Sequence, residues 1–288
     1  MALQMNSPGP PDFLVVGAQR SGTTWLHDVL TQHPDLWLPP IKELHYFDRP
    51  KLRRGWDRWN EWPLFFMAIA KSRDLWGFRY LFGLHGDEWY ASLFEKARAQ
   101  GFITGEVAPD YATLGDDVYQ RLAKMNPTMR IAFIMRDPVS RAWSAINRRT
   151  KVGRIRALSE EQALEMARSR NTAARACYMD TISRLEKFFP QQQLYFCFFD
   201  DLCARPEDFA KNIIRFLGAD PDKVSSMILP REANAAATGK PIPPGLECAL
   251  ARDYLPLLHD LCDRFDEPPK TWRTRYEQLI QGCAGSPG

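Results

Sequence analysis

Residues 13–30 read FLVVGAQRSGTTWLHDVL: an apolar run, a short glycine-bearing loop, and a second apolar segment at helical spacing. Gly17 and Gly22 allow a sharp turn and a close approach of the backbone to an anion. The stretch therefore predicts a phosphate-binding loop between a strand and a helix. A nucleoside-triphosphate loop places a lysine after its second glycine, but Thr23 stands there. The nearest cation, Arg20, precedes Gly22, which indicates a ligand other than a magnesium-bound triphosphate.

Short apolar segments alternate with helical patterns along the rest of the chain. Strands are expected at Phe13–Val16, Phe102–Glu106, Ile131–Met135 and Leu194–Phe199. Helices are expected at Thr23–Gln32, Glu88–Ala99, Asp116–Met125, Val139–Arg149, Ala173–Phe188, Glu207–Leu217 and Leu246–Arg264. This alternation predicts an α/β fold with a central parallel sheet flanked by helices. Sheets of this class bind ligands beyond the carboxyl ends of their strands.

Length and composition favour a single globular domain. The 288 residues carry a net charge of only +3, which gives no indication of nucleic-acid binding. Six scattered cysteines indicate free thiols, and neither a secretory signal nor a membrane span is recognisable, so we expect a cytoplasmic protein. We expect a disordered tail at 1–11 and one domain at 12–280. A tryptophan-rich helical insert at about 50–90 either packs its own small core or lines the site of an acceptor.

A second motif lies at residues 131–144, IAFIMRDPVSRAWS. Its strand ends at Arg136, after which Asp137 suits a helix N-cap and Pro138 the first helical position. Arg141 and Ser144 are three residues apart and share one helix face. Arg136 and Ser144 are thus expected to converge on an anion beside the first loop, so that the ligand carries two separated anionic groups.

Residues 42–48, KELHYFD, offer acid–base chemistry between the two anion motifs. Transfer of a group to an acceptor needs a base for the acceptor proton and cations where charge grows on the leaving group. Glu43 can be that base. An ordinary strand edge with a hydrogen-bonded His45 is the structural alternative.

Together, QRSGTTW and RDPVSRAWS resemble the motifs of sulfotransferases that use 3′-phosphoadenosine 5′-phosphosulfate (PAPS). The resemblance implies a P-loop-like fold and PAPS as co-substrate, without a metal. It implies that Arg136 and Ser144 bind the 3′-phosphate and that Trp25 stacks on adenine, although Trp25 also suits a core position. The residues implied on the 5′ side are Gln19, Arg20, Ser21, Gly22, Thr23 and Thr24.

The stretch KELHYFD is similar to a segment of glycosaminoglycan-type sulfotransferases. That similarity implies Glu43 as the base, supported by His45 and Asp48, while a family with a histidine base leaves His45 as the alternative. Two positions depart from the family or match it loosely: Val107 replaces a lysine that contacts the acceptor, and Lys240 is the nearest match to a loop over the 3′-phosphate. Phe199 falls where some members place an adenine-contacting aromatic residue.

The sequence as a whole predicts a sulfotransferase acting on a hydroxyl, less readily an amine, of a carbohydrate, lipid or small-molecule acceptor. Arg20 and Glu43 would be its central catalytic residues, with His45 and Asp48. A P-loop nucleotide or small-molecule kinase and a non-catalytic nucleotide-binding protein are the alternatives. The chain is compatible with a homodimer, and neither nucleic acid nor a membrane is expected as a partner.

Overall fold

The computed structural model describes residues 9–48, 76–82, 86–151, 158–226 and 241–284. Its centre is a five-stranded parallel sheet in the order β2-β3-β1-β4-β5. The strands are β1 (Phe13–Gly17), β2 (Leu36–Trp37), β3 (Ile103–Val107), β4 (Arg130–Met135) and β5 (Leu194–Phe198). β1 is the middle strand, so the loop that follows it opens at the carboxyl edge of the sheet, between β3 and β4.

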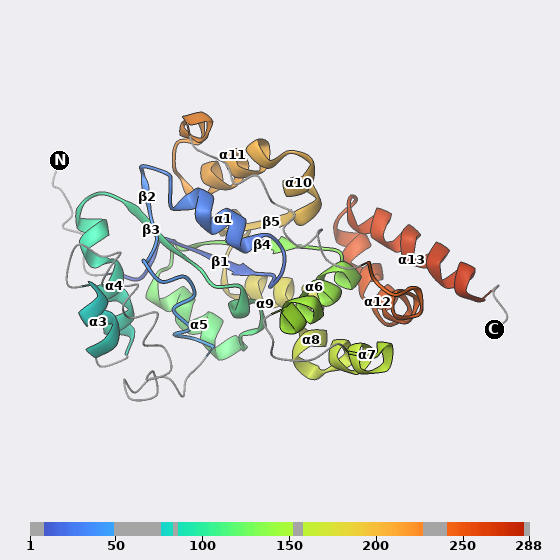
Figure 1. Cartoon of the computed structure of the whole chain (residues 1–288). Coiled ribbons are helices and arrows are strands. Elements are labelled where there is room, and N and C mark those ends of the chain that lie inside the picture. The colour runs from blue at the N-terminus through green and yellow to red at the C-terminus, as the bar shows by residue number, and fades with distance from the viewer. Residues whose placement is uncertain (1–8, 49–75, 83–85, 152–157, 227–240, 285–288) are drawn as a thin grey trace.

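Helices cover both faces of this sheet (Figure 1). They are α1 (Thr23–Leu30), α3 (Trp76–Phe82), α4 (Asp87–Ala99), α5 (Asp116–Met125), α6 (Pro138–Lys151), α7 (Glu160–Arg168), α8 (Arg170–Ala174), α9 (Tyr178–Phe188), α10 (Phe199–Ala204), α11 (Pro206–Leu217), α12 (Pro244–Arg264) and α13 (Pro269–Ala284). Short 3₁₀ helices lie at Pro109–Thr113, Gln191–Gln193 and Pro221–Ser226. The expected parallel α/β architecture is confirmed.

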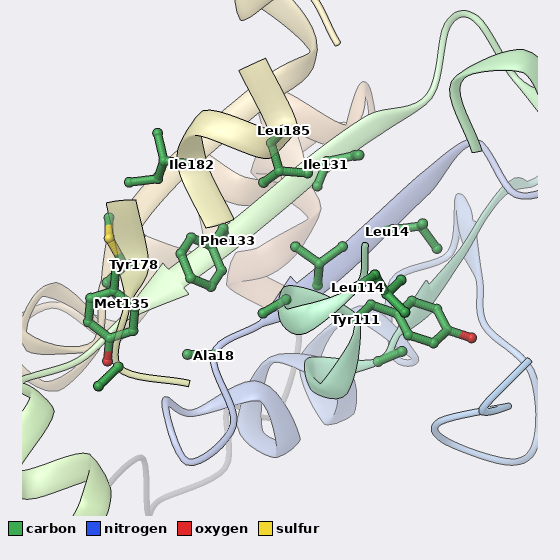
Figure 2. Close-up of a cluster of buried hydrophobic side chains, with 14 of the residues drawn as sticks. Leu14, Ala18, Tyr111, Leu114, Ile131, Phe133, Met135, Tyr178, Ile182 and Leu185 are labelled. Atoms are coloured by element: carbon green, nitrogen blue, oxygen red, sulfur yellow. The ribbon is translucent and has the colours of Figure 1, made fainter. Parts of the chain in front are cut away.

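Alternation along β1 divides the core into two layers. Leu14 and Val16 belong to the larger cluster with α5 and α9, whereas Phe13 and Val15 face α1 and α11. Successive side chains of a strand point to opposite faces, so an all-apolar strand is what a doubly covered sheet requires. Figure 2 shows the larger cluster, where Ile182 and Leu185 of α9 lie over Ile131 and Phe133 of β4.

Several element boundaries differ from those expected. The helix predicted at Ala173–Phe188 is two helices, α8 and α9, separated by three residues, 175–177. The last strand ends at Phe198, because Phe199 begins α10. Besides the 3₁₀ helices, the two-residue strand β2, the short helices α7 and α10, and α13 were not expected from the sequence.

The C-terminal helices α12 and α13 pack against each other beside α6 (Figure 1). Tyr276 of α13 is buried, and its hydroxyl accepts the backbone amide of Val139 at 3.0 Å. Arg275 donates to the Asp137 carboxylate at 3.0 Å. The last described helix therefore helps to fix the start of α6.

Most of the expected tryptophan-rich insert, residues 49–75, lies outside the described residues. The part that the structure describes, α3 and α4, is helical and packs on the main core through Trp76 and Trp89. The two indole nitrogens donate to backbone carbonyls, of Leu93 at 2.9 Å and of Arg79 at 2.6 Å. These two tryptophans thus have a packing role. Within the described part of the chain, no helix combines the length and hydropathy of a membrane span.

Candidate functional site

The loop between β1 and α1 has the backbone shape of an anion site. Gly22 is the N-cap of α1 with φ of 80°, and Arg20 also adopts a left-handed conformation with φ of 74°. A Cβ on Gly22 would lie 2.4 Å from Leu202 Cδ2, so only glycine fits there. Ser21 is fully buried, and among the described residues its hydroxyl has no hydrogen-bond partner. A buried unpaired hydroxyl at a helix N-terminus fits a loop built to receive anionic oxygens.

The second motif also forms as expected. Asp137 caps α6 by accepting the Ser140 amide at 2.7 Å, and Pro138 is the first helical residue. Arg141 does not turn toward the site: it is fully buried and donates to the Thr172 carbonyl at 2.8 Å. Ser144, three residues further along the same helix, contacts Arg20 instead, so the two side chains have different partners.

The two anion motifs meet directly. Arg20 Nε donates to Ser144 Oγ at 3.0 Å, and Arg136 donates from a terminal nitrogen to the Arg20 carbonyl at 2.8 Å. The Arg136 guanidinium also lies over the Phe199 ring, 4.4 Å from its centroid. The Tyr178 hydroxyl donates to the Arg136 carbonyl at 2.6 Å. One connected network therefore spans residues 20 to 178.

Positive charge is concentrated around this junction. Burial lowers the pKa of Arg20, and repulsion from Arg148 and Arg136 lowers it further. Burial likewise lowers the pKa of Arg136. Burial also lowers the pKa of Lys42, against the attraction of Glu43. Cations that are desolvated beside one another gain stability when an anion binds among them.

Lys42 and Arg148 were not singled out from the sequence. Lys42 Nζ donates to Thr24 Oγ1 at 2.8 Å, which joins the KELHYFD segment to the first turn of α1. Arg148 lies on α6 one turn beyond Ser144. The i, i+4 spacing of Arg148 and Ser144 was a readable signal for one shared face.

The proposed base lies next to its predicted supports. His45 Nδ1 and Asp48 Oδ2 are 2.8 Å apart, and His45 Nε2 lies 3.7 Å from Glu43 Oε2. Glu43 and His45 both have left-handed backbones, with φ of 62° and 55°. Asp110 is a close neighbour: one carboxylate oxygen each of Glu43 and Asp110 and one ring nitrogen of His45 all lie within 4.8 Å of one another. Gln19 Nε2 donates to Asp110 Oδ1 at 3.2 Å, and Arg175 donates to the same oxygen at 2.9 Å.

Beneath this segment lies a carboxyl group that sequence reasoning overlooked. Glu106, near the end of β3, is 1% exposed, and one of its oxygens accepts the Leu44 amide at 2.7 Å. The Tyr90 hydroxyl donates to its other oxygen at 2.7 Å, and the Tyr111 hydroxyl lies 3.3 Å from the first. Burial raises the pKa of Glu106 to about 7, although the bonds from Tyr90 and Leu44 oppose the rise.

The other predicted site residues lie in different surroundings. Trp25 is 4% exposed and packs edge-on against Phe209 in the core, so its stacking on adenine stays a prediction. Phe199 is buried beneath Arg136. Thr23 is buried and Thr24 exposed on the first turn of α1, and Val107 faces the core layer of α1. Lys240 lies outside the described residues.

Comparison with known proteins places these observations in a family. Residues 11–223, well over half of the chain, match the sulfotransferase family. Human bifunctional heparan sulfate N-deacetylase/N-sulfotransferase 2 is 23% identical over 227 residues, covering 73% of this chain and 22% of that protein. Mouse heparan sulfate glucosamine 3-O-sulfotransferase 5 is 23% identical over 220 residues, covering 73% of this chain and 54% of that protein. This chain thus spans only part of the length of both relatives.

Solved structures show the same fold. A sulfotransferase from Alicyclobacillus acidocaldarius superposes with a TM-score of 0.62 at 23% identity, covering 92% of this chain and 99% of that one. The sulfotransferase domain of the Synechococcus PCC 7002 olefin synthase superposes with a TM-score of 0.53 at 16% identity, covering all of both chains. With the matched residues spanning the loop between β1 and α1, the KELHYFD segment and the RDPVSRAWS motif, the chain belongs to the sulfotransferase family.

Proposed function

We propose that this protein transfers a sulfuryl group from PAPS to a hydroxyl, less readily an amine, of an acceptor molecule. The observation that carries the proposal is the junction of the two anion motifs. Arg20 contacts both Ser144 and Arg136, and Lys42 connects the same loop to the segment of Glu43. A donor with two separated anionic groups matches such a bipartite cationic site, and a lysine-free loop matches a phosphosulfate.

The donor would bind across this junction. We assign the 5′-phosphosulfate to the β1–α1 loop, where the unpaired Ser21 hydroxyl, Gly22 and the start of α1 offer donors to its oxygens. We assign the 3′-phosphate to Arg136 and Ser144. When bound, PAPS supplies the sulfuryl group and leaves as adenosine 3′,5′-bisphosphate.

The chemical step follows from the placement of the proposed base. Glu43 takes the proton from the acceptor hydroxyl as the acceptor oxygen forms its bond to sulfur. The bond between sulfur and the bridging phosphate oxygen breaks, and the departing phosphate keeps that electron pair. Arg20 and the loop stabilise the negative charge that grows on it. His45, between Glu43 and Asp48, orients the Glu43 carboxylate.

The acceptor side differs in charge from the donor side. Glu43 and Asp110 face each other there, with Arg175 bound to Asp110, while Val107 replaces the expected lysine and is turned into the core. Two relatives carry heparan sulfate in their names, and a carbohydrate hydroxyl is a suitable acceptor class here. Valine in place of that lysine favours a sugar without dense sulfation over a polyanion. Independence of a metal, a cytoplasmic location and a homodimer stay predictions from the sequence.

A thermal-shift comparison tests donor recognition. Adenosine 3′,5′-bisphosphate should raise the melting temperature more than 5′-AMP or ATP at equal concentration, because only it carries the 3′-phosphate. Equal shifts with ATP, or a shift that requires magnesium, would support a P-loop kinase instead.

Glu43→Gln separates an enzyme from a nucleotide-binding protein. The variant should bind the bisphosphate like wild type, while transfer from PAPS to a panel of sugar, phenol and amine acceptors falls on the order of 10²–10⁴-fold. Unchanged transfer would remove Glu43 as the base. His45→Gln, measured in parallel, reports whether the histidine serves instead.

A further inference from the structure

The segment that carries the proposed base has a backbone that its own residues do not favour. Glu43 and His45 have φ of 62° and 55°, in the left-handed region that non-glycine residues seldom occupy. Each such residue costs on the order of 1–2 kcal/mol relative to an ordinary conformation. The conformation persists only if surrounding contacts hold it in place.

Leu44, the residue between Glu43 and His45, makes a contact that can hold this backbone in place. Leu44 is fully buried, and its amide donates to a Glu106 carboxylate oxygen at 2.7 Å. Two residues further on, the Tyr46 amide donates to the Tyr111 hydroxyl at 3.1 Å, and that hydroxyl in turn lies 3.3 Å from Glu106. Glu106 is thus the common anchor of the Glu43–Tyr46 backbone, 62 residues away along the chain from Leu44.

A carboxyl group is a costly anchor, which argues that its chemistry is used. Glu106 is 1% exposed, and an apolar side chain of similar size would avoid the desolvation cost. Burial raises the pKa of Tyr90 and of Tyr111 well above the usual value, so both phenols stay protonated and act as donors. Either form of the carboxyl group, neutral or ionised, has an oxygen that can accept the Leu44 amide.

We propose that Glu106 is the positioning residue of the general base: one of its side-chain oxygens binds the Leu44 amide and so holds the left-handed turn that aims Glu43 at the acceptor. This inference rests on the proposed role of Glu43. Glu106 does not touch the reacting atoms. It acts through the backbone of residues 43–46. Val107, the next residue along β3, points to the other face of the sheet, into the core layer of α1 and α11.

The test compares two substitutions that differ in one property. Glu106→Gln keeps an oxygen that can accept the Leu44 amide, whereas Glu106→Leu keeps the approximate size and removes the acceptor. Tyr90→Phe is the matched control, because it removes the hydrogen bond to the other carboxylate oxygen and leaves the Leu44 contact in place. Binding of adenosine 3′,5′-bisphosphate, measured by calorimetry, checks that each variant is folded with an intact donor loop.

Backbone hydrogen exchange, read at the Leu44 amide by mass spectrometry with fragmentation, gives a result without any acceptor. Exchange should become about tenfold or more faster in Glu106→Leu, the factor expected when a buried amide loses its acceptor. It should stay near wild type in Glu106→Gln and Tyr90→Phe. Unchanged exchange in a folded Glu106→Leu protein would overturn the proposal.

Turnover of the best acceptor found for the wild type then tests the link to catalysis. Glu106→Leu should lower kcat on the order of 10²-fold, as expected for a misplaced base, with the KM for PAPS little changed. Glu106→Gln should keep most of the wild-type kcat. If Glu106→Leu has the kcat of wild type while Glu43→Gln is inactive, the positioning role of Glu106 is refuted and the role of Glu43 as the base is not. An active Glu43→Gln would instead refute the proposed base and leave the exchange result intact.

Discussion

The buried carboxyl group of Glu106 should make this protein less stable as pH rises from about 5 to 8, and Glu106→Gln should remove that contribution. Burial raises its pKa to about 7 from the ordinary 4.5. The folded protein therefore holds a proton on Glu106 between these pH values that the unfolded chain has already released. Stability is greatest below the unfolded pKa and falls as pH rises toward the folded one.

The magnitude follows from the size of the shift. A rise from 4.5 to about 7, at 1.36 kcal/mol per unit, corresponds to roughly 3 kcal/mol of lost stability across this window. Between pH 5 and pH 8 the loss should be about 2.5 kcal/mol. Among the described residues, the hydroxyls of Tyr90 and Tyr111 contact Glu106, and the charges of His45 and Asp48 also act on its pKa. His45 favours the charged carboxyl and Asp48 the neutral one.

Urea unfolding of wild type and Glu106→Gln at pH 5, 6, 7 and 8 measures this difference. The free energy of unfolding of the wild type should decline relative to the variant as pH rises, because glutamine does not titrate. Equal m-values for the two proteins would confirm that the same transition is compared. Parallel pH profiles, or a wild type that gains stability relative to the variant, would refute the reasoning.

Three further substitutions test the donor side. Gly22→Ala should cost about 2–4 kcal/mol of stability, because of the left-handed backbone and the clash with Leu202, and it should abolish bisphosphate binding. Chemical unfolding measures the stability and calorimetry the binding. Retained binding would contradict a donor site at this loop. Arg136→Met should reduce the preference for adenosine 3′,5′-bisphosphate over 5′-AMP about 10- to 100-fold, measured as the ratio of dissociation constants; an unchanged ratio would remove Arg136 from the 3′-phosphate site. Trp25→Ala should lower the free energy of unfolding, measured in urea, by about 3–5 kcal/mol, because the indole packs against Phe209 in the core. Weaker bisphosphate binding with unchanged stability would instead favour the stacking of Trp25 on adenine.

The turn between β1 and α1 and the start of α6 could be predicted because their signals are local. Gly22 marks the turn before α1, and Asp137 followed by Pro138 marks the start of α6, each within a few residues of the backbone it shapes. The meeting of Arg20 with Ser144 also follows from topology, since β1 and β4 are neighbours in a parallel sheet.

What the sequence could not show depends on contacts between distant segments. Glu106 looks like an ordinary residue at a strand end, and its role appears only when the Leu44 amide is seen to lie against it. Arg141 lies three residues before Ser144, yet the sequence could not show that it is fully buried and donates to the Thr172 carbonyl of α8. The break between α8 and α9 at residues 175–177 carries neither glycine nor proline that would have revealed it.

The contacts between α13 and the start of α6 bear on how this protein can be divided. The match to the family ends at residue 223, which would suggest that everything after it is dispensable. Yet Tyr276 and Arg275 bind the amide and carboxylate that open the helix of Ser144. A fragment cut at the family boundary would leave the Val139 amide without its acceptor and lose the restraint on Asp137. We therefore expect the smallest active unit to extend through α13, and a separately produced C-terminal peptide that includes this helix is a candidate to restore activity in trans.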